Sequence, residues 1–180
     1  MNSVAQRQSG LPRIVPLVFT LLVIIGDRVS KLFIKHHMSG FDMVPVIPGW
    51  LRIIHTENPG AAFGMLANGN PILRSVVLIG VSALVLVFVA SSLLGRNESF
   101  SAPAARFGLA LILGGAAGNL YDRVAHGTVT DFIEVFHGTW AFPAFNVADS
   151  AITVGAILLL SDMLRPKGRS AEGQAGLAHK

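Results

Sequence analysis

The sequence predicts an all-α integral membrane protein with four transmembrane helices and a small extended or β cradle between the first and second spans. Three observations lead to this class. Of the 180 residues, 52% are hydrophobic and only 13% are charged, whereas an ordinary soluble domain is about one-quarter charged. The apolar residues gather in four long segments. The polar residues that interrupt these segments recur at one depth.

Composition excludes several other classes. The high hydrophobicity excludes a disordered chain, and the absence of cysteine excludes a disulfide framework, a cysteine nucleophile and a zinc–thiolate site. The net charge is +4, but the basic residues form no stripe with interleaved aromatic side chains, so no nucleic-acid partner is expected. The six histidines show no ligand spacing. We therefore expect neither a metal site nor a cofactor.

The candidate spans cover approximately residues 14–25, 76–94, 107–121 and 142–164. A span needs roughly 20 mostly apolar residues. The second segment is long enough by itself, and each of the others is long enough only when its polar end is counted as part of the helix. No small-residue cleavage site follows Ile25, which favours a retained span over a signal peptide. We expect one membrane domain over 14–165, with loops at about 38–71 and 123–143. A cytoplasmic segment (1–13) precedes it and a disordered cytoplasmic tail (166–180) follows it.

The loop charges predict that both termini are cytoplasmic, because lysine and arginine accumulate on that side of a membrane. In this orientation eight of the fourteen basic residues flank the cytoplasmic helix ends: Arg7, Arg13, Arg96, Arg106, Arg165, Lys167, Arg169 and Lys180. The polar interruptions then share the outer ends of three spans: Asp27 and Lys31, Asn119 and Asp122, Asn146 and Asp149. Several ionisable residues at one depth predict a shared functional site near the outer surface.

Between the first and second spans, apolar residues from Met43 onward are broken by Pro and Gly, which indicates short strands. Asn58 opens an Asn-Pro-Gly turn. The turn either packs on the membrane surface or points Asn58 into a site.

Asp131 and Asp149 are the strongest candidates for catalysis, because both carboxyls lie among apolar residues. Desolvation raises a carboxyl pKa, and two neighbouring carboxylates can share a proton, so that one acts as acid and the other as base. That arrangement can activate water against an amide without a metal. The alternative is structural: Asp131 caps a short helix and Asp149 makes a hydrogen bond within the fold.

The other polar residues have simpler explanations as well. Asp27 and Lys31 are four residues apart on one helix face, which favours a structural ion pair over direct contact with the substrate. Asp122 and Arg123 form either a solvated interfacial pair or part of the site. Gly114 and Gly118 form a G-x-x-x-G pattern that either permits close helix packing or provides a smooth groove for a peptide backbone.

Five motifs, in this order, resemble the bacterial lipoprotein signal peptidase (signal peptidase II) family. They are D-R-V-S-K from Asp27, N-P-G-A-A-F from Asn58, G-N-L-Y-D-R from Gly118, V-T-D-F from Val129 and F-N-V-A-D-S from Phe145. They extend from the first span to the fourth, and together they are far more specific than any one of them.

The resemblance implies an aspartyl endopeptidase of the inner membrane with its active site at the periplasmic face. Such enzymes cut prolipoproteins before a diacylglyceryl-modified cysteine and are inhibited by globomycin. The catalytic positions correspond to Asp131 and Asp149. The substrate-binding positions correspond to Asn58, Gly115, Asn119, Arg123 and Asn146, and the supporting positions to Asp27, Lys31 and Asp122. Expected partners are the lipidated precursors and membrane lipids, and the enzyme is expected to be a monomer.

Two other classes compete with this interpretation. A small proton-coupled transporter also carries buried aspartates on several spans, but broken helices at the midplane and an internal repeat would be expected. A non-catalytic membrane scaffold would not need so many ionisable residues at one depth.

Overall fold

The computed structural model describes residues 12, 14–60, 70–95, 100 and 102–165. In these ranges the elements follow the order α1 (Ile14–His37), β1 (Met43–Ile47), β2 (Leu51–Asn58), α2 (Pro71–Leu94), α3 (Pro103–His126), β3 (Val129–His137), β4 (Trp140–Ala141) and α4 (Val147–Met163). Apart from residue 12, the expected N-terminal segment 1–13 lies outside the described residues, as do the expected tail 166–180 and the Ala-Ala-Phe part of the Asn58 motif.

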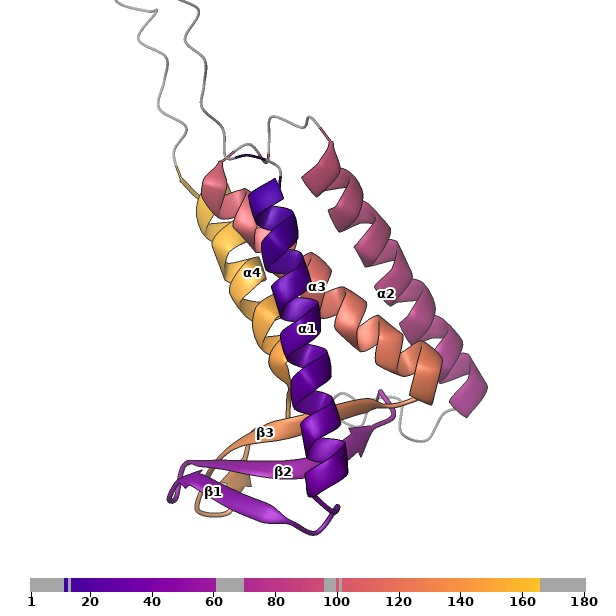
Figure 1. Cartoon of the computed structure of the whole chain (residues 1–180), viewed down its shortest axis with the longest axis vertical. Coiled ribbons are helices and arrows are strands. Elements are labelled where there is room, and N and C mark those ends of the chain that lie inside the picture. Colours follow the sequence, from indigo (N-terminus) through magenta and orange to yellow (C-terminus); the bar gives the residue numbers. More distant parts are fainter. Residues whose placement is uncertain (1–11, 13, 61–69, 96–99, 101, 166–180) are drawn as a thin grey trace, which may run out of the picture.

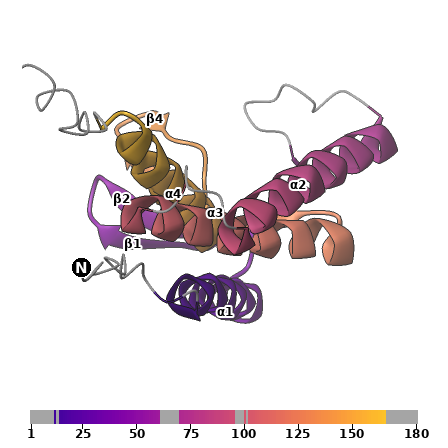
Figure 2. The same cartoon turned by 90° about the horizontal axis from the view of Figure 1, so that it is seen from above.

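Helix α3 is the centre of the bundle and contacts α1, α2 and α4 (Figure 2). Its glycines allow this close approach. A Cβ atom on Gly108 would lie 2.7 Å from the carbonyl oxygen of Gly155 in α4, and one on Gly115 would lie 2.3 Å from the carbonyl oxygen of Ala148. A Cβ atom on Gly114 would lie 2.9 Å from the carbonyl oxygen of Thr20 in α1, and one on Gly118 would lie 2.5 Å from Asp27 Oδ2, so the expected helix-packing role of these two glycines is confirmed.

Helices α1, α2 and α3 extend beyond the predicted apolar segments, whereas the fourth helix begins later than predicted. Helix α4 begins at Val147 instead of about Phe142, because Pro143 precedes an extended stretch and Asn146 caps the helix. The Asn146 side chain accepts a hydrogen bond from the backbone N–H of Asp149 at 2.9 Å, which satisfies one of the free amides at a helix start. By contrast, α1 continues through Asp27 and Lys31, as expected.

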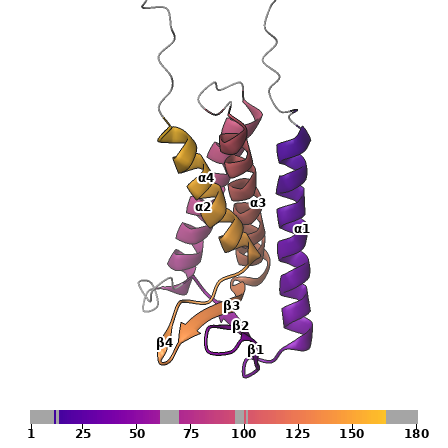
Figure 3. The ribbon, with the colours of Figure 1, turned by 90° about the vertical axis from the view of Figure 1, so that its left-hand side faces the viewer.

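Helix α2 is long and apolar enough to cross a membrane by itself, and among the described residues it alone meets that test. Only 11% of its most apolar window is buried inside the protein, so its side chains are suited to contact lipid. The start of α1 and the end of α4 lie at the end of the bundle opposite the sheet (Figures 1 and 3).

The strands form one antiparallel sheet in the order β1-β2-β3-β4. The predicted strands of the first loop are confirmed, but the cradle is not confined to that loop, because β3 and β4 come from the segment between α3 and α4. Strand β3 pairs with β2 across a long stretch of sequence, with Thr56 opposite Asp131. One extra residue of β2 is accommodated between Ile53 and Thr56, which is a β-bulge beside Asp131.

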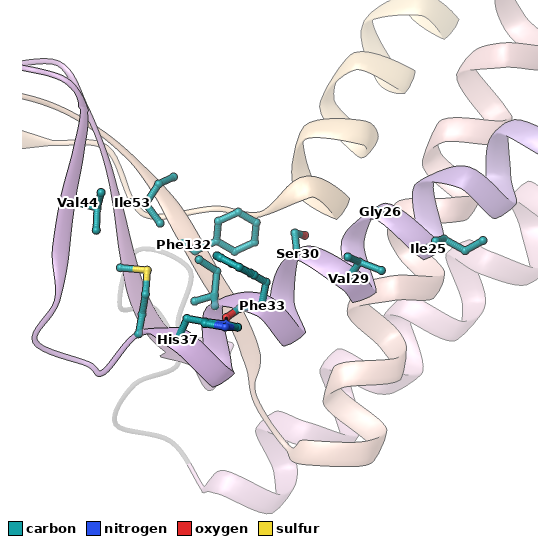
Figure 4. Close-up of a pocket in the computed structure, with 11 residues that line it drawn as sticks. Ile25, Gly26, Val29, Ser30, Phe33, His37, Val44, Ile53 and Phe132 are labelled. Atoms are coloured by element: carbon teal, nitrogen blue, oxygen red, sulfur yellow. The ribbon is translucent and has the colours of Figure 1, made fainter.

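An apolar pocket of about 750 Å³ separates the C-terminal half of α1 from the sheet (Figure 4). Phe132 of β3 points into this pocket toward Phe33 of α1 (Figure 4). Successive side chains of a strand point to opposite faces. Asp131, the preceding residue, therefore projects to the other side of β3, toward the start of α4.

Candidate active site

Asp131 is held by two asparagine side chains that come from different elements. Asn58, the last residue of β2, donates from Nδ2 to Asp131 Oδ2 at 2.9 Å. Asn146, the N-cap of α4, donates from Nδ2 to Asp131 Oδ1 at 2.7 Å. Both oxygens of this carboxyl thus have amide donors. The alternative that Asp131 caps a short helix is wrong, because Asp131 lies within β3.

Asn146 brings the two candidate aspartates together. While its side chain donates to Asp131, its backbone N–H donates to Asp149 Oδ2 at 3.3 Å, which completes a capping box at the start of α4. Asp131 and Asp149 therefore lie on either side of one fully buried asparagine. A helix cap, a local feature of the sequence, sets the relation between residues that are eighteen positions apart in the chain.

Asn119 of α3 fixes the other oxygen of Asp149. Its Nδ2 donates to Asp149 Oδ1 at 2.7 Å. Its Oδ1 accepts from Lys31 Nζ at 3.0 Å and from Asn146 Nδ2 at 3.3 Å. These contacts permit one orientation of the Asn119 amide, with the NH₂ group toward Asp149.

Beneath Asn119, Lys31 belongs to a buried ionic cluster that joins α1 to α3. Its Nζ lies 2.8 Å from Asp27 Oδ2 and 2.7 Å from Asp122 Oδ2. Arg28 Nη1 pairs with the other oxygen of Asp122 at 2.7 Å. Asp27 also accepts from the backbone N–H of Ala148 at 3.0 Å, which ties α1 to the first turn of α4.

The cluster corrects one expectation and adds one residue. Asp122 is fully buried and pairs with Lys31 and Arg28, so it does not form a solvated interfacial pair with Arg123. Sequence reasoning missed Arg28. Its charge, directly after Asp27 within an apolar segment, was the available signal.

Arg123 lies at the end of α3 and faces the same group of carboxylates. Its Nη1 donates to the Asn119 carbonyl at 3.3 Å, and its charge interacts with those of Asp149 and Asp131. Its Nε is buried, and no described residue accepts a hydrogen bond from it. A buried guanidinium N–H without an acceptor is a donor available to a bound molecule. Gly115 lets α4 approach α3 closely, and its expected role in substrate binding stays a prediction.

Burial dominates the electrostatics of Asp131. Loss of hydration raises its pKa from 3.8 to about 6, and the charge of Asp149 acts in the same direction, while the hydrogen bonds from Asn58 and Asn146 oppose the shift. The side chain of Asp131 is therefore suited to carry a proton in slightly acidic conditions while a second carboxylate lies nearby.

Because the pKa of Asp131 is raised, we expect the free energy of unfolding to fall as the pH rises. Its contribution to stability is fully present below pH 3.8 and is lost as the pH rises through about 6. One pKa unit corresponds to about 1.4 kcal/mol. Between about pH 3.5 and 7 the free energy of unfolding of the wild type should therefore fall by about 3 kcal/mol relative to that of Asp131→Asn. Thermal unfolding in detergent across this range measures the difference, and a difference independent of pH would contradict the raised pKa.

Each aspartate opens onto its own cavity. Asp131 lines a polar pocket of about 260 Å³ together with Asn58 and Glu57. Asp149 lines an apolar groove of about 440 Å³. The groove is also lined by Phe145, just before α4, and by Val154 of α4. No group of three or more His, Asp or Glu side chains in the described part of the chain is arranged to hold a metal ion. The arrangement is suited to acid–base chemistry by two carboxyls next to an apolar groove.

The fold and the site together define a small helical bundle with one candidate membrane span among the described residues and a pair of buried or half-buried carboxyls beside a four-stranded sheet. Comparison with known proteins identifies the family. The family model for signal peptidase (SPase) II matches residues 19–165. The chain belongs to the signal peptidase II family.

Relatives and solved structures agree with this assignment. The lipoprotein signal peptidase of Solibacter usitatus is 42% identical over 150 residues, which cover 83% of this chain and 90% of that protein. The lipoprotein signal peptidase of Pseudomonas fluorescens (strain Pf-5) is 46% identical over 155 residues, with coverages of 84% and 88%. A bacterial membrane enzyme solved by the in meso method at 1.9 Å resolution is 30% identical, with a TM-score of 0.73, and the match covers 84% of this chain and 94% of that chain.

Proposed function

We propose that this chain cleaves prolipoproteins by an aspartic mechanism in which Asp131 and Asp149 form the catalytic dyad. Its family removes signal peptides from prolipoproteins, so this chain is a membrane peptidase with that activity. The observation that carries the aspartic assignment is the position of both carboxyls on the two sides of Asn146. The transporter alternative finds no support in the family or its relatives.

In this mechanism one carboxyl removes a proton from a water molecule as the water attacks the scissile carbonyl, and the other protonates the leaving amine. Burial raises the pKa of Asp131 to about 6, which favours Asp131 as the protonated partner at rest. Arg123 Nε is buried beside the dyad without an acceptor among the described residues. We assign it to the substrate carbonyl, where negative charge develops. Asn58, Asn119 and Asn146 orient the two carboxyls and line the path of the peptide.

The substrate in this proposal is a signal peptide that ends at a diacylglyceryl-modified cysteine. A transmembrane helix has no free amide to attack, because its backbone groups are bonded within the segment. The peptide must therefore unwind where it reaches the dyad. The apolar groove from Asp149 past Val154 suits the last apolar residues of the signal peptide. A globomycin-type inhibitor would occupy the same cleft.

The membrane arrangement belongs to the same proposal. Residues 14–165 form one domain in which all four helices span the bacterial inner membrane, and both termini are cytoplasmic. The sheet and the dyad lie at the periplasmic face, within reach of membrane lipids. The protein acts as a monomer. The common position of the α1 start and the α4 end, opposite the sheet (Figure 1), supports this topology.

Cleavage of a lipidated precursor by the purified full chain tests the activity. A synthetic prolipoprotein peptide with a diacylglyceryl cysteine, incubated in detergent, should lose its signal segment with a mass change that places the cut directly before the cysteine. The same peptide without the lipid is the control and should be cut much more slowly. No cleavage of the lipidated peptide by a folded protein would contradict the proposal.

Cysteine labelling tests the topology, since the natural chain has no cysteine. Thr139 lies in the turn between β3 and β4, so a cysteine in its place should react with a membrane-impermeant thiol reagent in cells with a permeable outer membrane. A cysteine at Ser170, in the tail, should react only after the inner membrane is opened. The reverse result would place the dyad on the cytoplasmic side.

A further inference from the structure

Glu57 lies next to the dyad without belonging to it. It immediately precedes Asn58 in β2 and pairs across the sheet with Thr130, which immediately precedes Asp131 in β3. Paired residues of neighbouring strands project to the same face of a sheet, and their successors project to the other face. Glu57 and Thr130 therefore lie on the face of the sheet opposite to Asn58 and Asp131.

The carboxylate of Glu57 joins three elements. Thr128 Oγ1 donates to its Oε2 at 2.6 Å and Thr130 Oγ1 donates to its Oε1 at 3.0 Å, both from the β3 side. Lys35 Nζ of α1 lies 3.5 Å from Oε1, and His55 Nε2 of β2 lies 3.3 Å from the same atom. Partial burial works against ionisation of Glu57, but the hydrogen bonds from Thr128, His55 and Thr130 keep its pKa below the ordinary value. The group is therefore an anion at neutral pH.

The hydrogen bonds from Thr128 and Thr130 hold Glu57 in place more strongly than its ion pair with Lys35 does. Lys35 and Glu57 have side chains that are 27% and 37% exposed, and exposed pairs of this kind contribute little to stability. Hydroxyl donors to a carboxylate are stronger, because the acceptor is charged. They bridge β2 and β3 on the side of the bulge where Thr56, Glu57 and Asn58 pair with β3. A bulge loosens the register of a strand pair locally, and a slip of one residue would turn Asp131 away from the site.

We propose that Glu57 is a positioning residue for the peptidase reaction: its contacts with Thr128 and Thr130 fix the register of β2 against β3, so that Asn58 meets Asp131. This inference rests on the proposed dyad. Glu57 acts through Asn58 and Asp131, so its loss lowers kcat while the KM for the lipidated precursor stays nearly constant.

Steady-state cleavage by three variants of the full chain tests the proposal. Glu57→Ala should lower kcat about tenfold, less than the roughly hundredfold effect of a 1 Å misplacement of a reacting group, and should leave KM within about twofold of the wild type. Glu57→Gln keeps an acceptor for a threonine and should recover most of the lost rate. Glu134→Ala is the matched control, because Glu134 joins the same two strands through Arg52 on the far side of the bulge. It should retain the wild-type kcat.

A double-mutant cycle separates positioning from general loosening of the sheet. If Glu57 acts through Asn58, Glu57→Ala should cost little further rate in an Asn58→Ala background. Independent, multiplicative losses would overturn the proposal, as would an unchanged kcat in Glu57→Ala, a raised KM, or an equal loss in Glu134→Ala. Failure of the proposed function is distinguishable from these results, because the wild type would then not cleave, or Asp131→Asn would still turn over.

Discussion

Replacement of Asp131 or of Asp149 by asparagine is expected to lower kcat for the lipidated precursor by at least about a thousandfold, within the range that acid–base groups contribute. An amide cannot exchange the proton that activates water and is then passed to the leaving amine. Asp131 lies between the amides of Asn58 and Asn146, and Asp149 between Asn119 and the backbone of Asn146.

The double variant sharpens this prediction. Two groups that act as a unit give non-additive losses, so Asp131→Asn with Asp149→Asn should be no slower than the worse single variant. Asp162→Asn is the matched control, because it makes the same chemical change near the other end of α4, far from the sheet. It should retain full activity. Thermal unfolding in detergent must show that all variants fold, and normal turnover by either single variant would remove that residue from the dyad.

The sequence was sufficient to predict four helical segments and to mark Asp131 and Asp149 as candidate site residues, because apolar runs and carboxyls among apolar residues are local features. Long apolar segments specify helices, and ionisable residues in an apolar chain are costly enough to mark a site. The start of α4 was also encoded locally: Asn146 and Asp149 have the spacing of a capping box. The apolar pattern before it led instead to a start near Phe142, since Phe142 and Phe145 are apolar but belong to the extended stretch and the groove.

Which strands pair in the sheet could not be predicted in the same way. Strand β2 pairs with β3, which follows α2 and α3 in the chain, and no local signal specifies a partner that far away. The contact of Asn58 with Asp131 depends on this pairing. The pairing of Arg28 with Asp122 likewise depends on how α1 is rotated against α3, which the glycines of α3 and the ionic cluster determine together.

Removal of the Lys31 charge should have the largest effect on stability. Lys31 is 1% exposed, and its ammonium is the shared partner of Asp27 and Asp122, which are fully buried. Breaking a buried ion pair by removing one partner costs about 3–5 kcal/mol, because the remaining charge is left uncompensated. Lys31→Met should therefore lower the free energy of unfolding in detergent by about that amount. It should also lower kcat, because the Asn119 amide loses the donor that orients it toward Asp149.

A second substitution distinguishes charge balance from lost packing. In Lys31→Met combined with Asp27→Asn, the charge of Asp122 is still neutralised by Arg28 at 2.7 Å, and an asparagine oxygen can still accept from the Ala148 backbone. We expect the double variant to be more stable than Lys31→Met alone, although it carries one more change, and to remain slow because Asn119 is still unrestrained. Equal stability of the two variants would show that the ammonium acts through packing, and wild-type kcat in both would separate Lys31 from the orientation of Asn119 and Asp149.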